Sequence, residues 1–146
     1  MGDIKGFIKY NRELPKSRDP LARINDYKEI YKDFSEDKTN VQAARCMDCG
    51  VPFCHSGCPL GNNIPAFNDA VFKKDWKDAF QILDSTNNFP EFTGRICPAP
   101  CEASCVLGIN KDPVAIELIE KSIVETAYEL GLIAPSPPKN RTGKRV

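Results

Sequence analysis

The chain has 146 residues, enough for one hydrophobic core, and a second core is not expected. Its 20 Lys and Arg residues balance its 20 Asp and Glu residues, and no long run of one sign suits nucleic acid or an anionic membrane. The sequence has no apolar run of about 18 residues and no signal-peptide pattern at its N-terminus. We therefore expect a cytoplasmic protein without a nucleic-acid or membrane partner.

The first third of the chain predicts an arm followed by two helices. Residues 1–20 are polar, lack periodicity and contain two prolines, which predicts an extended N-terminal arm. Over residues 21–34 apolar side chains recur at helical spacing, which predicts an amphipathic helix. A second, short helix is predicted over about residues 39–46.

Two more helices are predicted in the middle of the chain. Asn63 can cap a helix that carries Pro65 in its first turn, and Asp75 can cap the next one. In that next helix the apolar residues recur at i, i+3, i+4 and i+7, a stripe typical of a core-facing helix. The stripe comprises Trp76, Ala79, Phe80 and Leu83.

The last predicted helix has signals at both ends. Asp112 is its expected N-cap, Pro113 its first residue and Gly131 its terminating residue. Residues 134–146 begin with a proline-rich stretch that reads as a stiff linker. Because strand patterns are lacking, we predict an all-α fold, with residues 21–133 as its helical domain.

Cysteine is the residue type that carries the chemistry. An odd number of cysteines without an export signal disfavours disulfides and favours metal or redox chemistry. The first run ends in Cys58-Pro59 and is close to the bacterial two-cluster ferredoxin pattern, in which the fourth cysteine serves the other cluster. We therefore expect two iron–sulfur clusters, with Cys58 apart from the cysteines that precede it. The seven fall into two groups: Cys46, Cys49, Cys54 and Cys58, then Cys97, Cys101 and Cys105.

Seven cysteines cannot supply eight ligands, so either one iron is open or another residue completes the second site. Glu120 lies on the apolar face of the last predicted helix. It can ligate iron, pair with a residue such as Arg95, or extend to solvent. The single histidine, His55, is expected to face solvent or to hydrogen-bond to a cluster. A zinc-stapled helical interaction module is the alternative, since Cys-x2-Cys is also a zinc half-site.

Several segments carry a family resemblance: residues 46–54 (CMDCGVPFC), 58–65 (CPLGNNIP), 93–98 (TGRICP), 101–105 (CEASC) and 141–146 (RTGKRV). In them the chain resembles the N-terminal domain of the small (beta) subunit of NAD(P)H-dependent glutamate synthase, over nearly its whole length. It is also similar to the N-terminal part of dihydropyrimidine dehydrogenase and of related flavin-dependent transhydrogenases. The resemblance implies an alpha-helical ferredoxin-like domain that binds two [4Fe-4S] clusters.

The resemblance also implies a ligand set. Glu120 falls at the position of a glutamine ligand in dihydropyrimidine dehydrogenase, whereas the shorter spacing between Cys97 and Cys101 departs from many relatives. The implied ligands of the first cluster are Cys46, Cys49, Cys54 and Cys105. Those of the second cluster are Cys58, Cys97, Cys101 and Glu120.

The implied function is an electron relay within an oxidoreductase. Electrons from NAD(P)H-reduced FAD are expected to cross both clusters toward the glutamate-forming large subunit. The chain contains no G-x-G-x-x-G, so FAD and NAD(P)H are expected only in downstream domains of the same subunit, beyond residues 134–146. No catalytic residue is expected in this chain. A related flavin oxidoreductase of the transhydrogenase or dihydropyrimidine dehydrogenase type is the alternative function.

Overall fold

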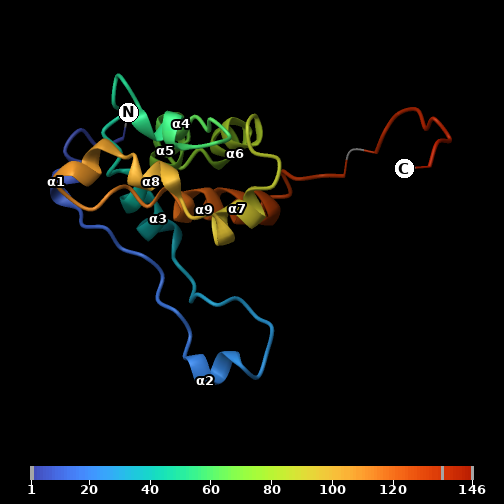
Figure 1. The fold of residues 1–146 in the computed structure, drawn as a ribbon, viewed down its shortest axis with the longest axis horizontal. Helices are drawn as coiled ribbons and strands as arrows, with labels where there is room; N and C mark the ends of the chain where they lie inside the picture. The colour runs from blue at the N-terminus through green and yellow to red at the C-terminus, as the bar shows by residue number, and fades with distance from the viewer. Residues whose placement is uncertain (1, 136, 146) are drawn as a thin grey trace.

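The computed structural model describes residues 2–135 and 137–145, and Figure 1 shows their arrangement. Met1, Ser136 and Val146, which belong to the predicted arm and linker, lie outside the described residues. The described helices are α1 (Gly6–Lys9), α2 (Pro20–Arg23), α3 (Glu36–Ala43), α4 (Phe53–Gly57), α5 (Ile64–Phe72), α6 (Trp76–Asp84), α7 (Pro90–Ile96), α8 (Pro100–Ala103), the 3-10 helix η1 (Val106–Ile109) and α9 (Ile116–Glu129). No strand occurs within these ranges, and the all-α prediction is confirmed.

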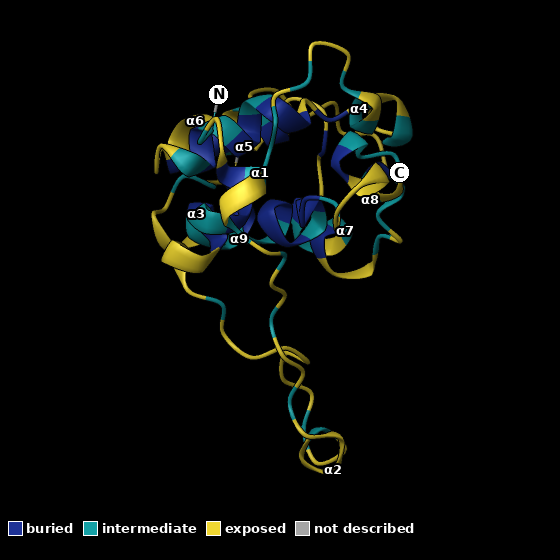
Figure 2. Cartoon of the chain, turned by 90° about the vertical axis from the view of Figure 1, so that its left-hand side faces the viewer, coloured by how far each residue is buried: buried dark blue, intermediate teal, exposed yellow. Residues whose placement is uncertain are grey.

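Helix α9 is the centre of the core. It packs against α3, α5, α6, α7 and α8, and its isoleucines 116, 119 and 123 are buried. Phe67 of α5 and Leu83 of α6 are fully buried in the same cluster. Burying a side chain of this size stabilises the fold by about 1.5–3 kcal/mol. Figure 2 shows buried residues concentrated in this helical body.

The two middle helices form where the sequence predicts them. Asn63 precedes α5, and Pro65 lies in the first turn of that helix. The side chain of Asp75 accepts a hydrogen bond from the backbone N–H of Asp78 at 3.0 Å, which caps α6. α5 and α6 therefore fill the interval between the two cysteine groups, as expected.

The predicted helix over residues 21–34 is wrong. Only α2 is helical there, and the antiparallel bridge between Ser17 and Tyr31 folds residues 13–35 into a projecting hairpin. The apolar side chains of Leu21, Ile24 and Tyr27 are mostly exposed and not packed into the core, so helical spacing alone does not sustain a helix. The predicted N-terminal arm, residues 1–20, includes α1 and the first strand-like limb of the projecting hairpin.

Two other helix boundaries differ from the prediction. α3 begins near Ser35, whose hydroxyl accepts a hydrogen bond from the backbone N–H of Lys38, rather than at about residue 39. α9 begins at Ile116 rather than at Asp112 and Pro113. Its end is as predicted, with Gly131 in the left-handed region at a φ of 68°.

The buried side chain of Arg45 explains the later start of α9. Its guanidinium donates to the carbonyl oxygens of Asp112 at 2.6 Å and Pro113 at 2.9 Å. In a helix those oxygens would instead accept from N–H groups four residues later. Arg45 therefore holds the segment before α9 in a non-helical conformation. None of the described helices is both long and apolar enough to cross a membrane.

Candidate iron–sulfur centres

The first cysteine run lies between α3 and the end of α4. Cys46 follows α3, Cys54 lies in α4 and Cys58 is the C-cap of that helix. Asp48 has a left-handed φ of 50°, so the chain turns sharply between Cys46 and Cys49. Cys58 has extended backbone angles, φ −89° and ψ 119°, and the chain leaves the helix there. Cys58 therefore lies where the chain leaves α4, whereas Cys54 lies within the helix.

A cavity lies beside this run. Its lining includes thiols from two distant segments and apolar side chains such as Ile64 and Ile116. The thiols are those of Cys46, Cys49, Cys54 and Cys105, the four ligands that the resemblance implies for the first cluster. Three thiolates from one loop and one from a distant segment is a common way to hold a cubane. Among the described side chains, no group of three His, Cys, Asp or Glu residues is arranged to hold a single metal ion.

The thiols of this cavity have raised pKa values. Burial raises the pKa of Cys46. Burial together with the neighbouring Cys46 and Cys105 raises the pKa of Cys54 to about 11, and burial and Cys105 raise the pKa of Cys49. Several neighbouring buried thiols lose their protons only when a positive charge offsets the repulsion between the thiolates. Iron supplies that charge, so the donor set fits an iron–sulfur cluster.

Asn68 of α5 lines the same cavity and is fully buried. Its side chain lies beside Cys46, where a hydrogen bond partly offsets the effect of burial on the pKa of that thiol. Apart from Cys46, neither Nδ2 nor Oδ1 of Asn68 has a partner among the described residues. Buried side-chain amides are rarely left without hydrogen-bond partners, and N–H groups that donate to sulfur are a feature of cluster sites. Asn68 therefore fits the edge of a cluster.

The sequence analysis missed Asn68, although the sequence contains a signal for it. The core stripe of α5 runs through Ile64, Phe67, Asn68 and Val71, at i, i+3, i+4 and i+7. An amide at a position where the helical period calls for an apolar residue needs a buried partner. The same reasoning singled out Glu120.

The second predicted ligand set comes from four elements. Cys58 ends α4, Cys97 ends α7, Cys101 lies in α8 and Glu120 lies in α9. Cys101 and Glu120 are each 5% exposed. Burial raises the pKa of Cys101, and negative charge on Glu120 and Cys58 raises it further. These three groups therefore lie within electrostatic range of one another, and Cys97 is carried by a helix that packs on α9.

Two glycines allow the elements of this set to approach closely. A Cβ on Gly57 would lie 2.3 Å from Oγ of Ser104, so α4 can contact the end of α8 only without a side chain there. A Cβ on Gly94 would lie 2.8 Å from Cα of Lys121, so α7 rests directly on the backbone of α9. The first contact brings α4 to α8 and the second brings α7 to α9, the elements that carry the predicted ligands.

Glu120 is neither paired with Arg95 nor extended to solvent. One of its carboxylate oxygens accepts a hydrogen bond from Nδ2 of Asn62 at 3.0 Å, and burial raises the pKa of the carboxyl to about 7. Arg95 instead forms ion pairs with Glu29 and Glu125. The predicted alternative of an Arg95 partner is therefore wrong. A buried carboxylate with an amide as its partner is a suitable anionic ligand for iron.

The structure gives His55 a contact that the sequence did not predict. Its Nε2 accepts a hydrogen bond from the backbone N–H of Ile64 at 3.1 Å, the first residue of α5. That N–H is one of the groups that a helix leaves unpaired at its start. His55 thus joins the start of α5 to the first cysteine run.

The fold, the four-thiol cavity and the buried carboxylate together define a helical iron–sulfur domain. Residues 23–132 match the family described as dihydropyrimidine dehydrogenase domain II, 4Fe-4S cluster. The chain belongs to this family, and the match confirms the prediction of 4Fe-4S chemistry. It gives no support to the zinc-stapled module.

Curated relatives indicate a particular branch. The chain is 54% identical over 147 aligned residues to the NADPH-dependent glutamate synthase small chain of Mycobacterium tuberculosis, and 51% identical over 155 to that of Bacillus subtilis. It is 54% identical over 145 residues to the NADH-dependent glutamate synthase of Schizosaccharomyces pombe. These matches cover 100%, 100% and 98% of this chain but only 30%, 31% and 7% of the respective relatives. The resemblance to glutamate synthase is confirmed, and the chain spans about a third of the bacterial small chains.

Proposed function

We propose that this chain is the electron-relay domain of a glutamate synthase small chain. It would carry two [4Fe-4S] clusters between NAD(P)H-reduced FAD and the large chain that forms glutamate. The observation that carries this proposal is the four-thiol cavity, in a chain whose whole length aligns with about a third of the M. tuberculosis small chain. Relatives of that kind favour this function over the transhydrogenase or dihydropyrimidine dehydrogenase type.

The proposed ligands follow the two groupings that the fold supports. Each bound cluster would accept and release one electron at a time. Cys46, Cys49, Cys54 and Cys105 would hold the first cluster, with Asn68 donating an N–H to its sulfur shell. The apolar lining of that cavity would limit the access of water, which together with hydrogen bonds to sulfur sets the reduction potential.

The second cluster would have a mixed ligand set. Cys58, Cys97 and Cys101 would supply thiolates, and Glu120 would supply a carboxylate. A harder oxygen ligand in place of a thiolate changes the electron density at one iron, so the two clusters should differ in potential. A difference in reduction potential between the two clusters would favour electron transfer in one direction along the relay.

The rest of the enzyme would lie in other domains and another chain. Residues 134–146 would form the linker to the FAD- and NAD(P)H-binding domains of the small chain, and residues 21–133 the helical two-cluster domain. Free thiols in this number need a reducing compartment, which supports a cytoplasmic location.

Anaerobic purification followed by analysis of iron, acid-labile sulfide and zinc tests the proposal. About eight irons and eight sulfides per chain are expected for two four-iron clusters. Electron paramagnetic resonance of the reduced protein should then show two spin systems. Stoichiometric zinc without sulfide would exclude the relay.

A further inference from the structure

The projecting hairpin, residues 13–35, stands away from the helical body in both ribbon views (Figures 1 and 2). Backbone hydrogen bonds join its limbs: Arg18 N–H donates to the Ile30 carbonyl at 2.9 Å, and Lys32 N–H donates to the Lys16 carbonyl at 2.8 Å. The limbs are therefore paired, and α2 lies at the far end. The hairpin is a defined element rather than a loose loop.

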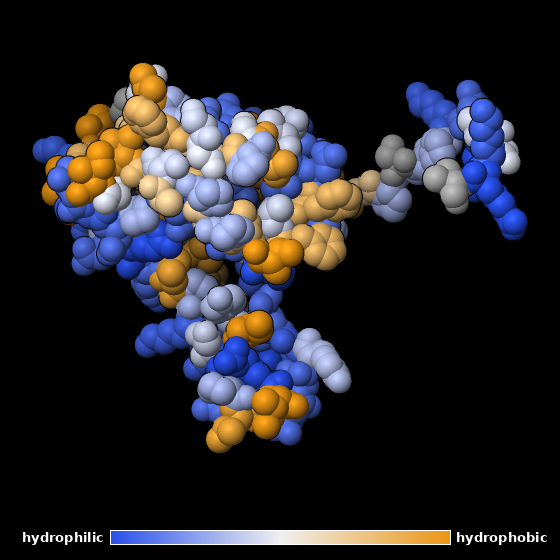
Figure 3. All heavy atoms as spheres, in the orientation of Figure 1, coloured by the Kyte–Doolittle hydropathy of each residue, from blue (hydrophilic) through white to orange (hydrophobic). Residues whose placement is uncertain are grey.

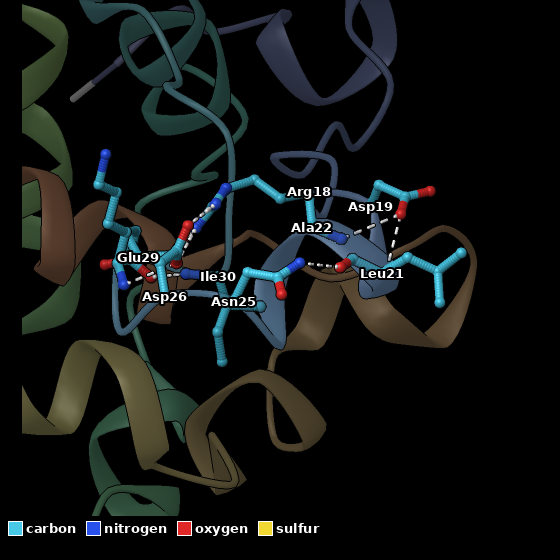
Figure 4. Close-up of polar contacts among 9 residues, drawn as sticks. Arg18, Asp19, Leu21, Ala22, Asn25, Asp26, Glu29 and Ile30 are labelled. Atoms are coloured by element: carbon cyan, nitrogen blue, oxygen red, sulfur yellow. Dashed lines mark hydrogen bonds and ion pairs between the residues drawn. The ribbon is translucent and has the colours of Figure 1, made fainter.

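Several polar groups of the hairpin bond to one another, as Figure 4 shows. The guanidinium of Arg18 donates twice to the Asp26 carboxylate, at 2.6 and 3.1 Å, and once to the Glu29 carbonyl at 3.0 Å. The side chain of Asp19 accepts from the backbone N–H of Leu21 at 2.8 Å and caps α2. These bonds fix the shape of the tip from within.

The large apolar side chains of the tip point outward instead. Leu21 is 74% exposed, Ile24 79% exposed, and Tyr27 fully exposed. Single exposed apolar residues are ordinary, but three on one small projection form a patch that the helical body does not cover. Apolar side chains on the hairpin are visible on its surface in Figure 3. Apolar side chains exposed at the tip of a projection whose shape is fixed from within are typical of an element that binds another protein.

The base of the hairpin holds it in a set orientation. The carboxylate of Glu29 pairs with Arg95 of α7 at 2.9 Å and with Lys121 of α9 at 3.1 Å. Tyr31 lies under the ammonium of Lys121, 5.8 Å from Nζ to the ring centroid. An element already fixed before binding loses less conformational entropy on association.

We infer that the tip of the projecting hairpin, with Leu21, Ile24 and Tyr27 as its anchors, docks into an apolar groove on the large chain that receives the electrons. The inference rests on the proposed function. The S. pombe relative includes the hairpin, since its match covers 98% of this chain, yet this chain is only 7% of that polypeptide. In the M. tuberculosis small chain the share is 30%. The single-chain relative thus joins this domain to polypeptide that the bacterial small chain does not contain.

The comparison of the longer S. pombe polypeptide with the separate bacterial small chain favours the large chain as the partner that the hairpin tip contacts. Where the additional polypeptide is a separate chain, the domain needs a non-covalent surface to hold it. The matches to the bacterial small chains cover the whole hairpin, since they span 100% of this chain.

The test uses a complete small chain with this domain, loaded with its cofactors, and a separately purified large chain. The double variant Ile24→Asp/Tyr27→Asp places two charges in the patch without touching a proposed cluster ligand. Ile4→Asp is the matched control, because Ile4 is 73% exposed and lies on the body near α1. Affinity is measured by sedimentation or calorimetry. NAD(P)H-dependent reduction of a soluble dye reports on the small chain alone.

The double variant should bind the large chain at least tenfold more weakly, with dye reduction unchanged and with Ile4→Asp behaving as the unmodified protein. Unchanged affinity in the double variant would overturn the inference while leaving the relay intact. Equal weakening by Ile4→Asp, or a change only in self-association of the small chain, would overturn it as well. If the unmodified chains reduce dye but never form a complex, both the partner in the proposed function and the inference fail.

Discussion

The carboxylate of Glu120 and the amide of Asn62 form a buried hydrogen bond of 3.0 Å between α9 and the loop before α5. Asn62 is held in turn, because the hydroxyl of Thr86 donates to its Oδ1 at 2.8 Å. The carboxylate therefore has a fixed direction and uses one oxygen for this bond. Such an orientation is what a ligand to a buried iron requires.

Glu120→Ala should remove the proposed fourth ligand of the second cluster and leave the first cluster in place. Iron and sulfide should fall from about eight to about four per chain, and one spin system should disappear. Glu120→Gln is the control, since its amide oxygen can still ligate iron and still accept from Asn62. It should retain both clusters with an altered potential for one. Two unchanged clusters in Glu120→Ala would remove this residue from the ligand set.

Asn68→Leu should change the potential of the first cluster without removing it. An N–H donor to sulfur stabilises the more negative, reduced state, so its loss should lower the potential by on the order of 50 mV. Redox titration followed by electron paramagnetic resonance measures both clusters in one sample. The second cluster is the internal control, because Asn68 lines only the cavity of the first. A parallel shift of both potentials would contradict a local effect.

The comparison of α5 and α6 with the projecting hairpin explains how far the sequence predicts this fold. In the two helices, Pro65 and the Asp75 cap agree with an apolar stripe that finds a core. Over residues 21–34 the stripe is equally regular, but the Arg18–Asp26 ion pair and the antiparallel bridge fold the segment back on itself. A periodic pattern predicts a helix only where a surface is available to bury it.

The residues of the candidate sites likewise divide into those that the sequence predicts and those that it does not. Cysteine spacing and a carboxylate on a core face are local signals, so Cys46 and Glu120 could be singled out from the sequence. The partners of buried polar groups are set by the tertiary structure. For this reason the bond from Asn62 to Glu120, and the bonds from Arg45 that delay α9, could not be predicted.

Gly94→Ala should destabilise the contact between α7 and α9. The added methyl group would meet the backbone of Lys121, which cannot move away as a flexible side chain could. Overpacking of this kind costs about 1–3 kcal/mol. Gly50→Ala is the matched control, since nothing lies within 4 Å of a Cβ at that position, and it should change stability by less than about 0.5 kcal/mol. Thermal unfolding of the loaded proteins at one scan rate compares them, and equal midpoints would contradict the close approach.

The attachment of the projecting hairpin should depend on pH through Glu29. Partial burial opposes ionisation of this carboxyl, but hydrogen bonds from Arg95 and Lys121 outweigh it and hold the pKa at about 2, below the ordinary 4.5. The ionised group therefore stabilises the folded state above about pH 4.5, and that stabilisation is lost as the pH falls toward 2. Because the Glu29 side chain is 38% exposed, solvent screening reduces its contribution to about 1 kcal/mol.

Glu29→Gln should accordingly loosen the hairpin at neutral pH and have little effect in acid. Limited proteolysis measures this, with thermolysin at pH 7 and pepsin at pH 3 acting on the exposed tip around Leu21. Faster cleavage of the variant is expected at pH 7. The difference should narrow at pH 3, below the ordinary pKa of 4.5, where the Glu29 carboxyl of the detached hairpin is protonated and its ion pairs stabilise the attached state less. Glu129→Gln, an exposed change at the end of α9, should match the wild type at both values. Equal cleavage of Glu29→Gln and wild type at pH 7 would show that other contacts, such as Tyr31 against Lys121, hold the hairpin to the body.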